Sequence, residues 1–320
     1  MKSFRQLLCG LAILFLLASV PCHADENGVG VWLPGFYGSL AAAPGKPGFS
    51  FTSLYYHSSL HAGKGVEMRR GSTFHSGIDA KVDIIAFVPG YTFETPVLGG
   101  QASIALMALG MRNKISAAAE LTGPRGRSFS REVSDSITSV GDLYPMGTLK
   151  WNFGVHNAMV YAAGSLPVGN YSQDRLANVG TGHGAIDGGA GYTYFNPSTG
   201  WEFSSVLGFT YNFENNHTDY QNGIDMHLDT GASYFFTPQF HAGLVGYAYR
   251  QITDDTGSGA RFGGFQSQVF GVGPQLGYMF TAGEKTQGYI NLKGYKEFEA
   301  KHRPEGWNLW LTVSFTFGGA

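Results

Sequence analysis

Cysteine is almost missing from this chain. The only two cysteines, Cys9 and Cys22, lie within the first 24 residues. This stretch has the features of a cleaved signal peptide, because Lys2 and Arg5 precede an apolar run and a small-residue cleavage site. We expect residues 1–24 to be removed on export. A mature chain without cysteine has no disulfide and no cysteine-based metal site or nucleophile.

Long apolar runs are missing as well. The run in the leader, Leu7 to Val20, is 14 residues long and therefore short for a membrane span, although an uncleaved anchor or a buried helix is the alternative to a signal peptide. Beyond residue 24, no run reaches the roughly 18 apolar residues that indicate a transmembrane helix. The mature sequence therefore predicts no membrane-spanning helix.

Charge is scarce too. Charged residues make up 14% of the chain, against about 25% in typical soluble domains, and the net charge is −2. The basic stripe that a nucleic-acid partner requires is not present. With so little charge and 14% aromatic residues, the chain would be poorly soluble unless much of its surface faced lipid. A closed β-barrel is the structure, other than a helix, that satisfies the backbone in lipid.

The strand-like segments alternate in polarity. From Trp307 to Phe317 every odd position is apolar, and the residues between are polar or hydroxylated except Trp310. The segment from Trp201 to Phe213 largely repeats this pattern. Successive side chains of a strand point to opposite faces, so both segments have one apolar and one polar face. A soluble sandwich shows the same alternation, but about eleven residues with aromatic ends are typical of a transmembrane barrel strand.

Turn residues and alternation together predict twelve strands. The links between these strands are alternately short and long, as are the periplasmic turns and external loops of outer-membrane barrels. Pro89 and Pro274 fall inside two strands, where we expect bulges or a break. The strands are predicted near residues 49–58, 78–93, 101–113, 140–153, 158–168, 186–196, 199–213, 225–236, 239–251, 267–281, 287–298 and 307–317.

The predicted fold class is all-β: a single antiparallel transmembrane β-barrel of about 12 strands, with both termini on the periplasmic side. Residues 25–48 do not resemble a strand, because an apolar, turn-rich stretch around Phe36 is followed by a linker rich in alanine and proline. We expect this segment to enter the barrel as a short plug or to cover its periplasmic mouth. The predicted organisation is therefore a signal peptide at 1–24, a plug-like segment at 25–48 and the barrel at 49–320.

The alternation also assigns polar side chains to a face. A charged side chain that faces lipid at the midplane costs about 2–4 kcal/mol, so the charged residues of the strands are expected to face the lumen. They form either a polar path for a solute or a network that packs a narrow barrel. The side chains assigned to the lumen are Lys150, Asn152, Glu202, Asn212, His227, Asp229, Asn291, Lys293, Tyr295 and Glu297.

A few apolar side chains stand apart from the lipid face. Phe235 and Trp310 occupy lumen positions, and Leu33, Phe36 and Tyr37 belong to the plug-like segment. A hydrophobic solute gains about 25 cal/mol per Å² of apolar surface that it buries, so an importer of such solutes needs an apolar site. These residues either form that site or pack the plug against the wall. The predicted substrate path consists of Leu33, Phe36, Tyr37, Glu202, His227, Asp229, Phe235, Lys293 and Trp310.

Motifs that carry chemistry are weak. No Gly-x-Ser-x-Gly elbow is present, and a barrel-embedded hydrolase with a Ser-His-Asp triad is a less favoured alternative. Residues 215–220 and 254–259 could bind a cation, but solvated loops are the favoured interpretation. The glycine-rich residues 180–184 lack the Lys-Ser/Thr pair of a phosphate loop. We expect no catalytic residue, no metal and no cofactor.

Several short motifs together resemble one family. They are Leu33-Pro34-Gly35-Phe36-Tyr37-Gly38, Gly141-Asp142-Leu143-Tyr144, Leu149-Lys150-Trp151, Leu166-Pro167-Val168-Gly169-Asn170-Tyr171, the stretch from Asn215 to Gly223, and Gly271-Val272-Gly273-Pro274. In this order they are similar to the putative meta-pathway of phenol degradation family. The resemblance implies an outer-membrane barrel, often encoded near aromatic-degradation genes, that imports hydrophobic compounds.

Two departures from the family pattern fall on one predicted external loop. Residues 166–169 read Leu-Pro-Val-Gly where Pro-Thr-Gly is usual, and residues 178–180 continue as Thr-Gly-His instead of with basic residues and tryptophan. Because both departures lie on an external loop, they concern the choice of substrate that the resemblance implies.

We therefore predict an outer-membrane channel of a Gram-negative bacterium for passive uptake of small hydrophobic, aromatic compounds. The alternative is a structural or surface-interaction barrel with a closed lumen. The expected partners are outer-membrane lipid, a hydrophobic small-molecule solute, the barrel-assembly machinery, and lipopolysaccharide facing Arg69, Arg70, Arg125 and Arg127.

Overall fold

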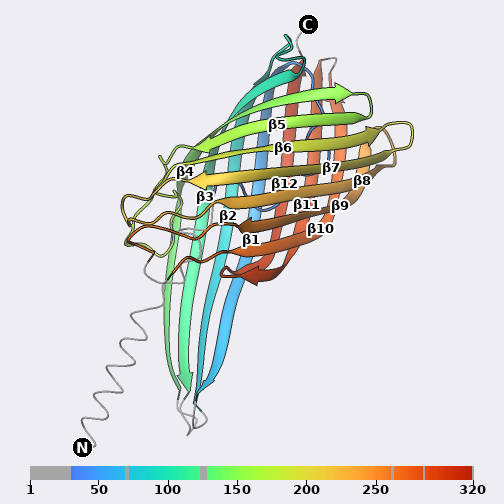
Figure 1. Cartoon of the computed structure of the whole chain (residues 1–320). Helices are drawn as coiled ribbons and strands as arrows, with labels where there is room; N and C mark the ends of the chain where they lie inside the picture. Colours follow the sequence, from blue (N-terminus) through green and yellow to red (C-terminus); the bar gives the residue numbers. More distant parts are fainter. Residues whose placement is uncertain (1–29, 69–71, 123–127, 261–262, 284, 319–320) are drawn as a thin grey trace, which may run out of the picture.

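The described residues form one closed barrel. The computed structural model describes residues 30–68, 72–122, 128–260, 263–283 and 285–318; the predicted signal peptide and residues 25–29 lie outside these ranges. Each of the twelve strands pairs antiparallel with its sequence neighbours, and β1 pairs with β12 to close the barrel (Figure 1). Among these residues, no helix is long and apolar enough to cross a membrane.

The strands cover most of the described chain. They are β1 (Gly48–Met68), β2 (Ser72–Thr92), β3 (Gln101–Thr122), β4 (Ser128–Phe153), β5 (His156–Ser165), β6 (Ala185–Asn196), β7 (Trp201–Asn212), β8 (Asp225–Phe235), β9 (Phe240–Gln251), β10 (Gln268–Ala282), β11 (Thr286–Lys301) and β12 (Glu305–Gly318).

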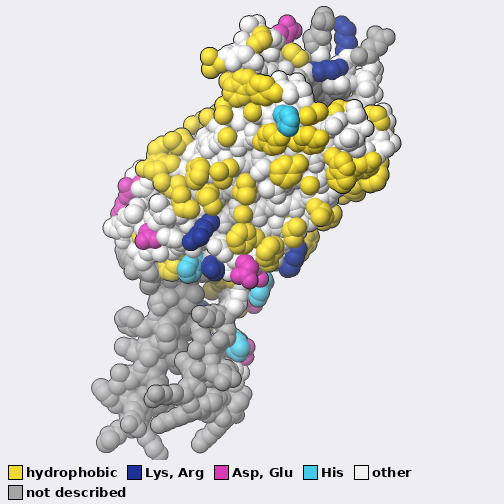
Figure 2. All heavy atoms as spheres, turned by 45° about the vertical axis from the view of Figure 1, so that its right-hand side comes forward, with side chains coloured by type: hydrophobic (Ala, Val, Ile, Leu, Met, Phe, Trp, Pro, Cys, Tyr) yellow, Lys and Arg dark blue, Asp and Glu magenta, His cyan; other side chains and the backbone are white. Residues whose placement is uncertain are grey.

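The outer face of the barrel is apolar. In β7, odd-numbered side chains such as Trp201 and Phe209 are exposed, whereas even-numbered ones such as Glu202 are buried in the lumen. In β12, Leu311 is exposed and Trp310 is buried. Figure 2 shows hydrophobic side chains spread over this outer face, with charged side chains mainly toward its upper and lower ends. An apolar outer band suits lipid contact, and the predicted twelve-stranded transmembrane barrel is confirmed.

The two rims of the barrel differ. Links of eight residues or fewer join β2 to β3, β4 to β5, β6 to β7, β8 to β9 and β10 to β11 at one rim, where β12 also ends. Longer loops lie at the other rim, over residues 166–184, 213–224 and 252–267. Since outer-membrane barrels have short periplasmic turns, we call the first rim periplasmic and the second external.

Four strands extend far beyond the others at the external rim. β1 to β4 have 21, 21, 22 and 26 residues, about twice the 9–11 residues that cross a membrane. Figure 1 shows them as two long hairpins. The prediction of loops over 59–77 and 114–139 is therefore wrong, because both ladders continue almost to the hairpin ends. In the sequence, these extensions consist mainly of small and polar residues with scattered apolar ones, so the regular apolar alternation that indicates a membrane strand is absent.

The two prolines within strands produce neither a bulge nor a break. In β2, Pro89 is opposite Phe51 of β1, but Val88 and Pro89 are not paired with β3. In β10, Pro274 is opposite Leu244 of β9, and pairing with β11 is interrupted in the same way. The register is unchanged on either side of both gaps. A proline lacks one donor, and here the ladder loses its pairing on one side only.

Residues 30–47, which we call the plug segment, lie inside the barrel and form no strand. Trp32 contacts Asp229 in the external half of β8, whereas Gly45 is hydrogen-bonded to Gln101 at the periplasmic rim. The segment therefore descends through the lumen before β1 begins. Trp32 is thus on the external side of Gly45, and residues 25–29, where the mature chain is predicted to begin, lie outside the described residues.

Candidate functional site

The plug segment is held on one side by polar side chains of the lumen. Lys293 of β11 is buried and donates hydrogen bonds from Nζ to the carbonyl oxygens of Gly35 at 2.6 Å, Phe36 at 3.1 Å and Tyr37 at 3.3 Å. The same ammonium lies 5.2 Å from the ring centre of Trp310. A buried charge is costly unless it is paired or hydrogen-bonded, so these carbonyls form the environment that Lys293 requires.

Glu202 of β7 holds the segment closer to the periplasmic rim. Its carboxylate accepts hydrogen bonds from the Ser39 hydroxyl and from the backbone N–H of Leu40. Ser39 also lies 3.0 Å from the Ser233 hydroxyl and accepts a hydrogen bond from Gln275 Nε2. Strands β7, β8 and β10 therefore converge on one serine of the segment.

Asp229 and His227 of β8 contact the external end of the segment. The indole Nε1 of Trp32 donates to Asp229 Oδ2 at 2.7 Å, and the Trp32 ring is stacked with the His227 ring at a centroid distance of 4.8 Å. His227 Nε2 is in turn 2.9 Å from Asp187 Oδ2, which accepts a hydrogen bond from Thr210. The imidazole is therefore fixed from the wall as well as covered by Trp32.

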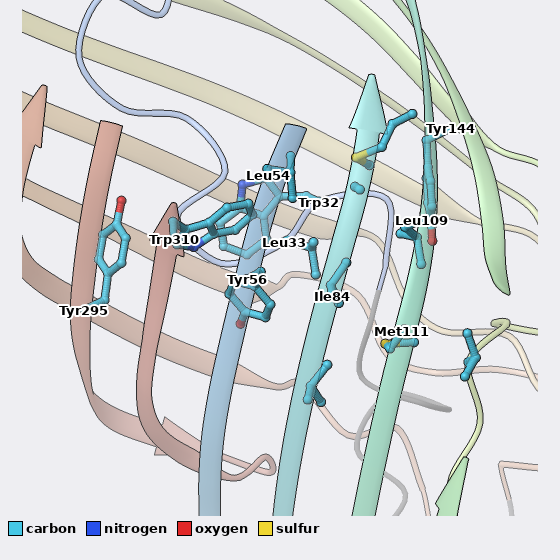
Figure 3. Close-up of a cluster of buried hydrophobic side chains, with 14 of the residues drawn as sticks. Trp32, Leu33, Leu54, Tyr56, Ile84, Leu109, Met111, Tyr144, Tyr295 and Trp310 are labelled. Atoms are coloured by element: carbon cyan, nitrogen blue, oxygen red, sulfur yellow. The ribbon is translucent and has the colours of Figure 1, made fainter. Parts of the chain in front are cut away.

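The aromatic residues of the predicted path also meet at the segment. Trp310 donates from Nε1 to the Pro34 carbonyl at 3.0 Å, and its ring lies edge-on to Phe36 at 6.1 Å. Tyr37 is packed against Tyr161 of β5 at 5.4 Å. Leu33 is 3% exposed and belongs to the apolar cluster drawn in Figure 3, where it lies near Trp32 and Trp310.

Phe235 is separate from this cluster. It lies at the last position of β8, toward the periplasmic rim, where its ring contacts are with Phe195 and His241, both at 4.7 Å. Of the other side chains assigned to the lumen, Lys150 donates to the Ala43 carbonyl and Tyr295 to the Gly35 carbonyl. Glu297 instead accepts from Tyr247 within the wall, and Asn152 is exposed at the periplasmic turn.

The side of the segment that faces β3–β6 has a different character. A small cavity lies there, between the segment and a largely apolar wall. The space open to the centre of a water molecule is about 10 Å³, enough for about one water. With the segment in place, the cavity is too small for an organic solute. Its lining includes Trp32, Phe36, Tyr37, Met107, Tyr144 and Tyr161.

An external loop covers the lumen above this region. Residues 166–184, which we call the lid loop, include Ala177 and Val179, and both are buried in the same apolar cluster as Trp32. Asp142 of β4 holds the loop: its Oδ1 accepts from Gly169 N at 2.7 Å, and its Oδ2 accepts from Thr181 N at 2.9 Å and Thr181 Oγ1 at 2.8 Å.

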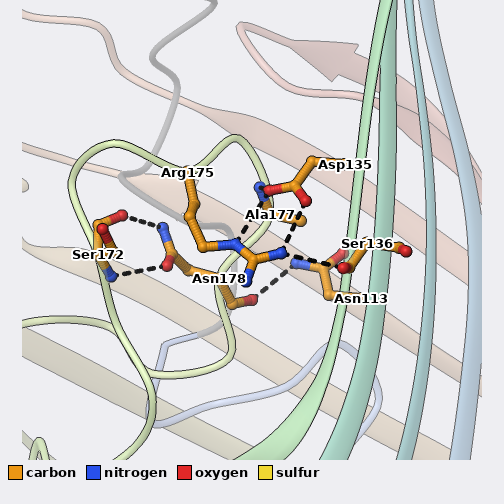
Figure 4. Close-up of polar contacts among 7 residues, drawn as sticks. All are labelled: Asn113, Asp135, Ser136, Ser172, Arg175, Ala177 and Asn178. Carbon is orange, nitrogen blue, oxygen red and sulfur yellow. Dashed lines mark hydrogen bonds and ion pairs between the residues drawn. The ribbon is translucent and has the colours of Figure 1, made fainter.

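A second carboxylate of β4 holds the lid loop farther out (Figure 4). Arg175 donates to Asp135 from Nε at 3.2 Å and from Nη2 at 2.7 Å, and Ala177 N donates to the same carboxylate. The hydrogen bond with Asp135 raises the pKa of the Arg175 guanidinium above its ordinary value. Asn113 of β3 completes the contact by donating to the Asn178 carbonyl at 2.9 Å.

A β-bulge explains why both carboxylates face the loop. The register between β3 and β4 shifts by one residue, so that Leu109 is opposite both Gly141 and Asp142. Side chains alternate between the two faces of a strand. One extra residue therefore moves every side chain of β4 beyond the bulge to the opposite face. Asp142 lies at the bulge and Asp135 beyond it. The alternation in the sequence does not reveal this bulge.

The other external loops are interlocked. Asp255 is buried and accepts hydrogen bonds from Tyr220 Oη at 2.6 Å, Gln251 Nε2 at 2.7 Å and Gly223 N at 3.1 Å. Asn215 is also buried, and its Oδ1 accepts from His217 N as an Asx-type turn does. The turn type is as expected, but the interpretation of residues 215–220 and 254–259 as solvated loops is wrong at Asn215, Tyr220 and Asp255, which are buried.

Metal binding and hydrolysis would both use titratable side chains of the described residues. None of their His, Asp and Glu side chains gather in a group of three or more that could hold a metal ion. The buried His227–Asp187 pair has Thr210 on its carboxylate and Trp32 over its imidazole. The arginines expected to face lipopolysaccharide, Arg69, Arg70, Arg125 and Arg127, lie outside the described residues.

Comparison with known proteins supports the same fold. The chain is similar to the COG4313 outer membrane channel from Pseudomonas putida F1, with 16% identity, a TM-score of 0.60, and coverage of 89% of this chain and 100% of the other. A FadL homologue from Pseudomonas aeruginosa is 9% identical, with a TM-score of 0.44 over 91% of this chain and 96% of the other. No curated protein sequence matches the chain. Residues 64–313 match the family described as "Putative MetA-pathway of phenol degradation", and the chain belongs to that family.

Proposed function

We propose that this protein is an outer-membrane channel for passive uptake of small hydrophobic, aromatic compounds, and that the plug segment must leave its position before a solute can pass. The observation that carries the proposal is how the segment is held. Its backbone–backbone hydrogen bonds, Phe36 N to Leu33 O and Ala43 N to Leu40 O, are internal turns. The wall holds it through side chains, so it can leave without breaking a barrel ladder.

The two sides of the lumen suit such a passage. Polar anchors, chiefly Glu202, Asp229 and Lys293, hold the segment from the side of β7–β11. The opposite side, toward β3–β6, has the aromatic and methionine side chains of the cavity lining. A hydrophobic solute gains free energy by burying its surface against such a lining, which a wide aqueous pore would not provide. The family description, which refers to phenol degradation, is consistent with an aromatic solute.

We propose no enzymatic role. Purified protein should have no esterase activity, and activity that survived removal of contaminants would instead favour a hydrolase.

A structural barrel is the second candidate, because the cavity holds about one water and the lid loop packs into the apolar cluster that contains Trp32. Single-channel recording in planar bilayers separates the two functions. We expect the full chain to be mostly closed and a variant lacking residues 30–43 to conduct steadily. A strain without the protein should grow more slowly on a limiting aromatic carbon source. Absence of conductance in both proteins, together with unchanged growth, would favour the structural role.

A further inference from the structure

The Trp32 side chain occupies a binding site that belongs to the barrel wall. Its indole N–H donates to Asp229 Oδ2 at 2.7 Å. Its ring is nearly parallel to His227, at 16° and 4.8 Å, and to Tyr249, at 3° and 5.8 Å. Tyr247 meets the ring edge-on at 5.9 Å. One aromatic ring with one N–H donor thus has three aromatic neighbours and a carboxylate acceptor, all on β8 and β9.

Three of the four wall residues of this site are positioned without help from the plug segment, whereas Asp229 is hydrogen-bonded to the segment itself. His227 is fixed by Asp187 of β6, as described above. Tyr247 Oη donates to Glu297 Oε1 of β11 at 2.7 Å, and Tyr249 Oη donates to Asp225 Oδ1 of β8 at 2.7 Å. Departure of Trp32 would therefore leave its three aromatic neighbours in place, and such preorganisation reduces the ordering cost of binding a replacement.

Two polar atoms of the site, Asp229 Oδ1 and His227 Nδ1, are buried and have no hydrogen bond of ordinary geometry, although buried polar atoms are normally paired. The backbone N–H of Tyr37, which also belongs to the plug segment, interacts with the Asp229 carboxylate, so departure of the segment would free this carboxylate further. The cavity described above borders Trp32 itself, so a solute that reached the cavity would be next to this ring.

From this geometry we infer that Trp32 is an internal stand-in for the transported solute. The site of His227, Asp229, Tyr247 and Tyr249 binds aromatic compounds that carry an O–H or N–H donor on the ring, such as phenols and indoles, and such a compound displaces Trp32. The inference rests on the proposed channel function and specifies its solute class. Aromatic hydrocarbons without a donor are poor competitors, because they leave the Asp229 carboxylate without the hydrogen bond that Trp32 supplied.

Fluorine NMR of the full protein in lipid nanodiscs tests this inference. The tryptophans are replaced by 5-fluorotryptophan, and the Trp32→Phe variant assigns the Trp32 signal. We expect phenol to shift or split this signal at about tenfold lower free concentration than toluene, the ratio that one hydrogen bond to a charged acceptor provides. Trp201 and Trp307, which are exposed on the outer face, report solute that merely partitions into lipid.

A matched pair of variants distinguishes recognition of the solute's O–H or N–H donor by Asp229 from a general loosening of the plug segment. In Asp229→Asn, the free concentrations of phenol and of toluene that shift the Trp32 signal should lie within about threefold of each other, because a neutral acceptor binds the donor less strongly. Glu202→Gln loosens the segment at Ser39 and Leu40 but leaves the site intact, so the tenfold ratio should persist. Heat-modifiable migration on gels checks that each variant is folded.

Three results would overturn the inference: an unchanged Trp32 signal in saturating phenol, equal effects of phenol and toluene, or a ratio that Asp229→Asn does not alter. If solute uptake persisted alongside any of them, the channel function would stand and only the site would be wrong. Phenol-selective displacement of Trp32 in a protein that never conducts would support the site and contradict the channel.

Discussion

The lumen charges of this barrel act on the backbone of the plug segment. Lys293 places its ammonium among the carbonyls of Gly35, Phe36 and Tyr37, and Glu202 accepts the N–H of Leu40. Such contacts satisfy buried charges without requiring a charged residue on the segment itself. The alternation in the sequence placed both side chains in the lumen, but it could not indicate their partners, because backbone groups leave no signal in composition.

Lys293→Met should loosen the plug segment while leaving the barrel intact. The variant keeps the length and apolar stem of the side chain but loses three hydrogen bonds from a charged donor. The equilibrium between the anchored and the displaced segment should therefore shift toward the displaced state by roughly 2 kcal/mol, or about 30-fold. Single-channel recording should show correspondingly more frequent openings. Lys150→Met is the matched control, since Lys150 makes one contact with the segment, at 3.2 Å to the Ala43 carbonyl. Equal opening rates in the two variants would contradict the anchoring role of Lys293.

Adjacent residues of β12 test the lipid face. Leu311 is 39% exposed on the outer surface, whereas Thr312 faces the lumen. Arginine at Leu311 should reduce assembly strongly, because a charge at the lipid midplane costs about 2–4 kcal/mol. Arginine at Thr312 should be tolerated better. The folded fraction in outer-membrane preparations, measured by heat-modifiable migration, compares the two, and equal losses would show that the register is wrong.

At the level of strands and loops, membrane-crossing segments could be predicted from sequence and the external structure could not. β7 and β12 have the strict alternation that lipid on one side imposes, and all twelve strands were found. The extensions of β1 to β4 lack that constraint, so their pairing left no pattern. The bulge at Gly141 and Asp142 is one extra residue, which no periodicity reveals. It nevertheless decides that Asp142 and Asp135 both hold the lid loop.

Glycine is required where the lid loop meets β4. A Cβ atom on Gly169 would lie 2.7 Å from the backbone carbon of Gly141 and 2.8 Å from Asp142 N. Backbone cannot move aside as a side chain can, so Gly169→Ala should lift the loop from Asp142 at a cost of about 1–3 kcal/mol. Hydrogen exchange of residues 166–184 should become faster.

Gly164→Ala provides the control for this prediction. The nearest atom to its added Cβ is the Ala185 carbonyl oxygen at 3.4 Å, an ordinary contact, so the lid loop should exchange as it does in the unchanged protein. Unaltered exchange in Gly169→Ala as well would mean that close packing on Gly141 does not hold the loop.

Taken as a whole, the molecule is a closed wall around a separable interior. β1 pairs with β12 without help from the plug segment, and the segment has no backbone–backbone hydrogen bond to the wall among the described residues. Strand patterns therefore predicted the wall, whereas the path of residues 30–47 depends on side chains of β7, β8, β11 and β12 that only the closed barrel brings together. The same separation allows the interior to change while the barrel persists.

A reversible cross-link tests whether the segment must leave for a solute to pass. The hydroxyl oxygens of Ser39 and Ser233 are 3.0 Å apart, so cysteines at both positions should form a disulfide that locks the segment to β8. Both natural cysteines lie in the predicted leader, and a mature chain without them offers no competing partner. Oxidised cells should take up a labelled aromatic compound no faster than cells lacking the protein, and a reductant should restore uptake.

Each single variant, Ser39→Cys and Ser233→Cys, should be insensitive to oxidation, which controls for effects of the oxidant on the membrane. A disulfide-locked protein that still imported the compound would show that solutes slip past the anchored segment on the side of β3–β6. In that case the gate would be confined to the external end of the segment, where Trp32 lies 2.7 Å from Asp229 and seven residues before the lock. Uptake through the locked protein would then depend on Trp32 alone, and Trp32→Ala would be the variant that raises it.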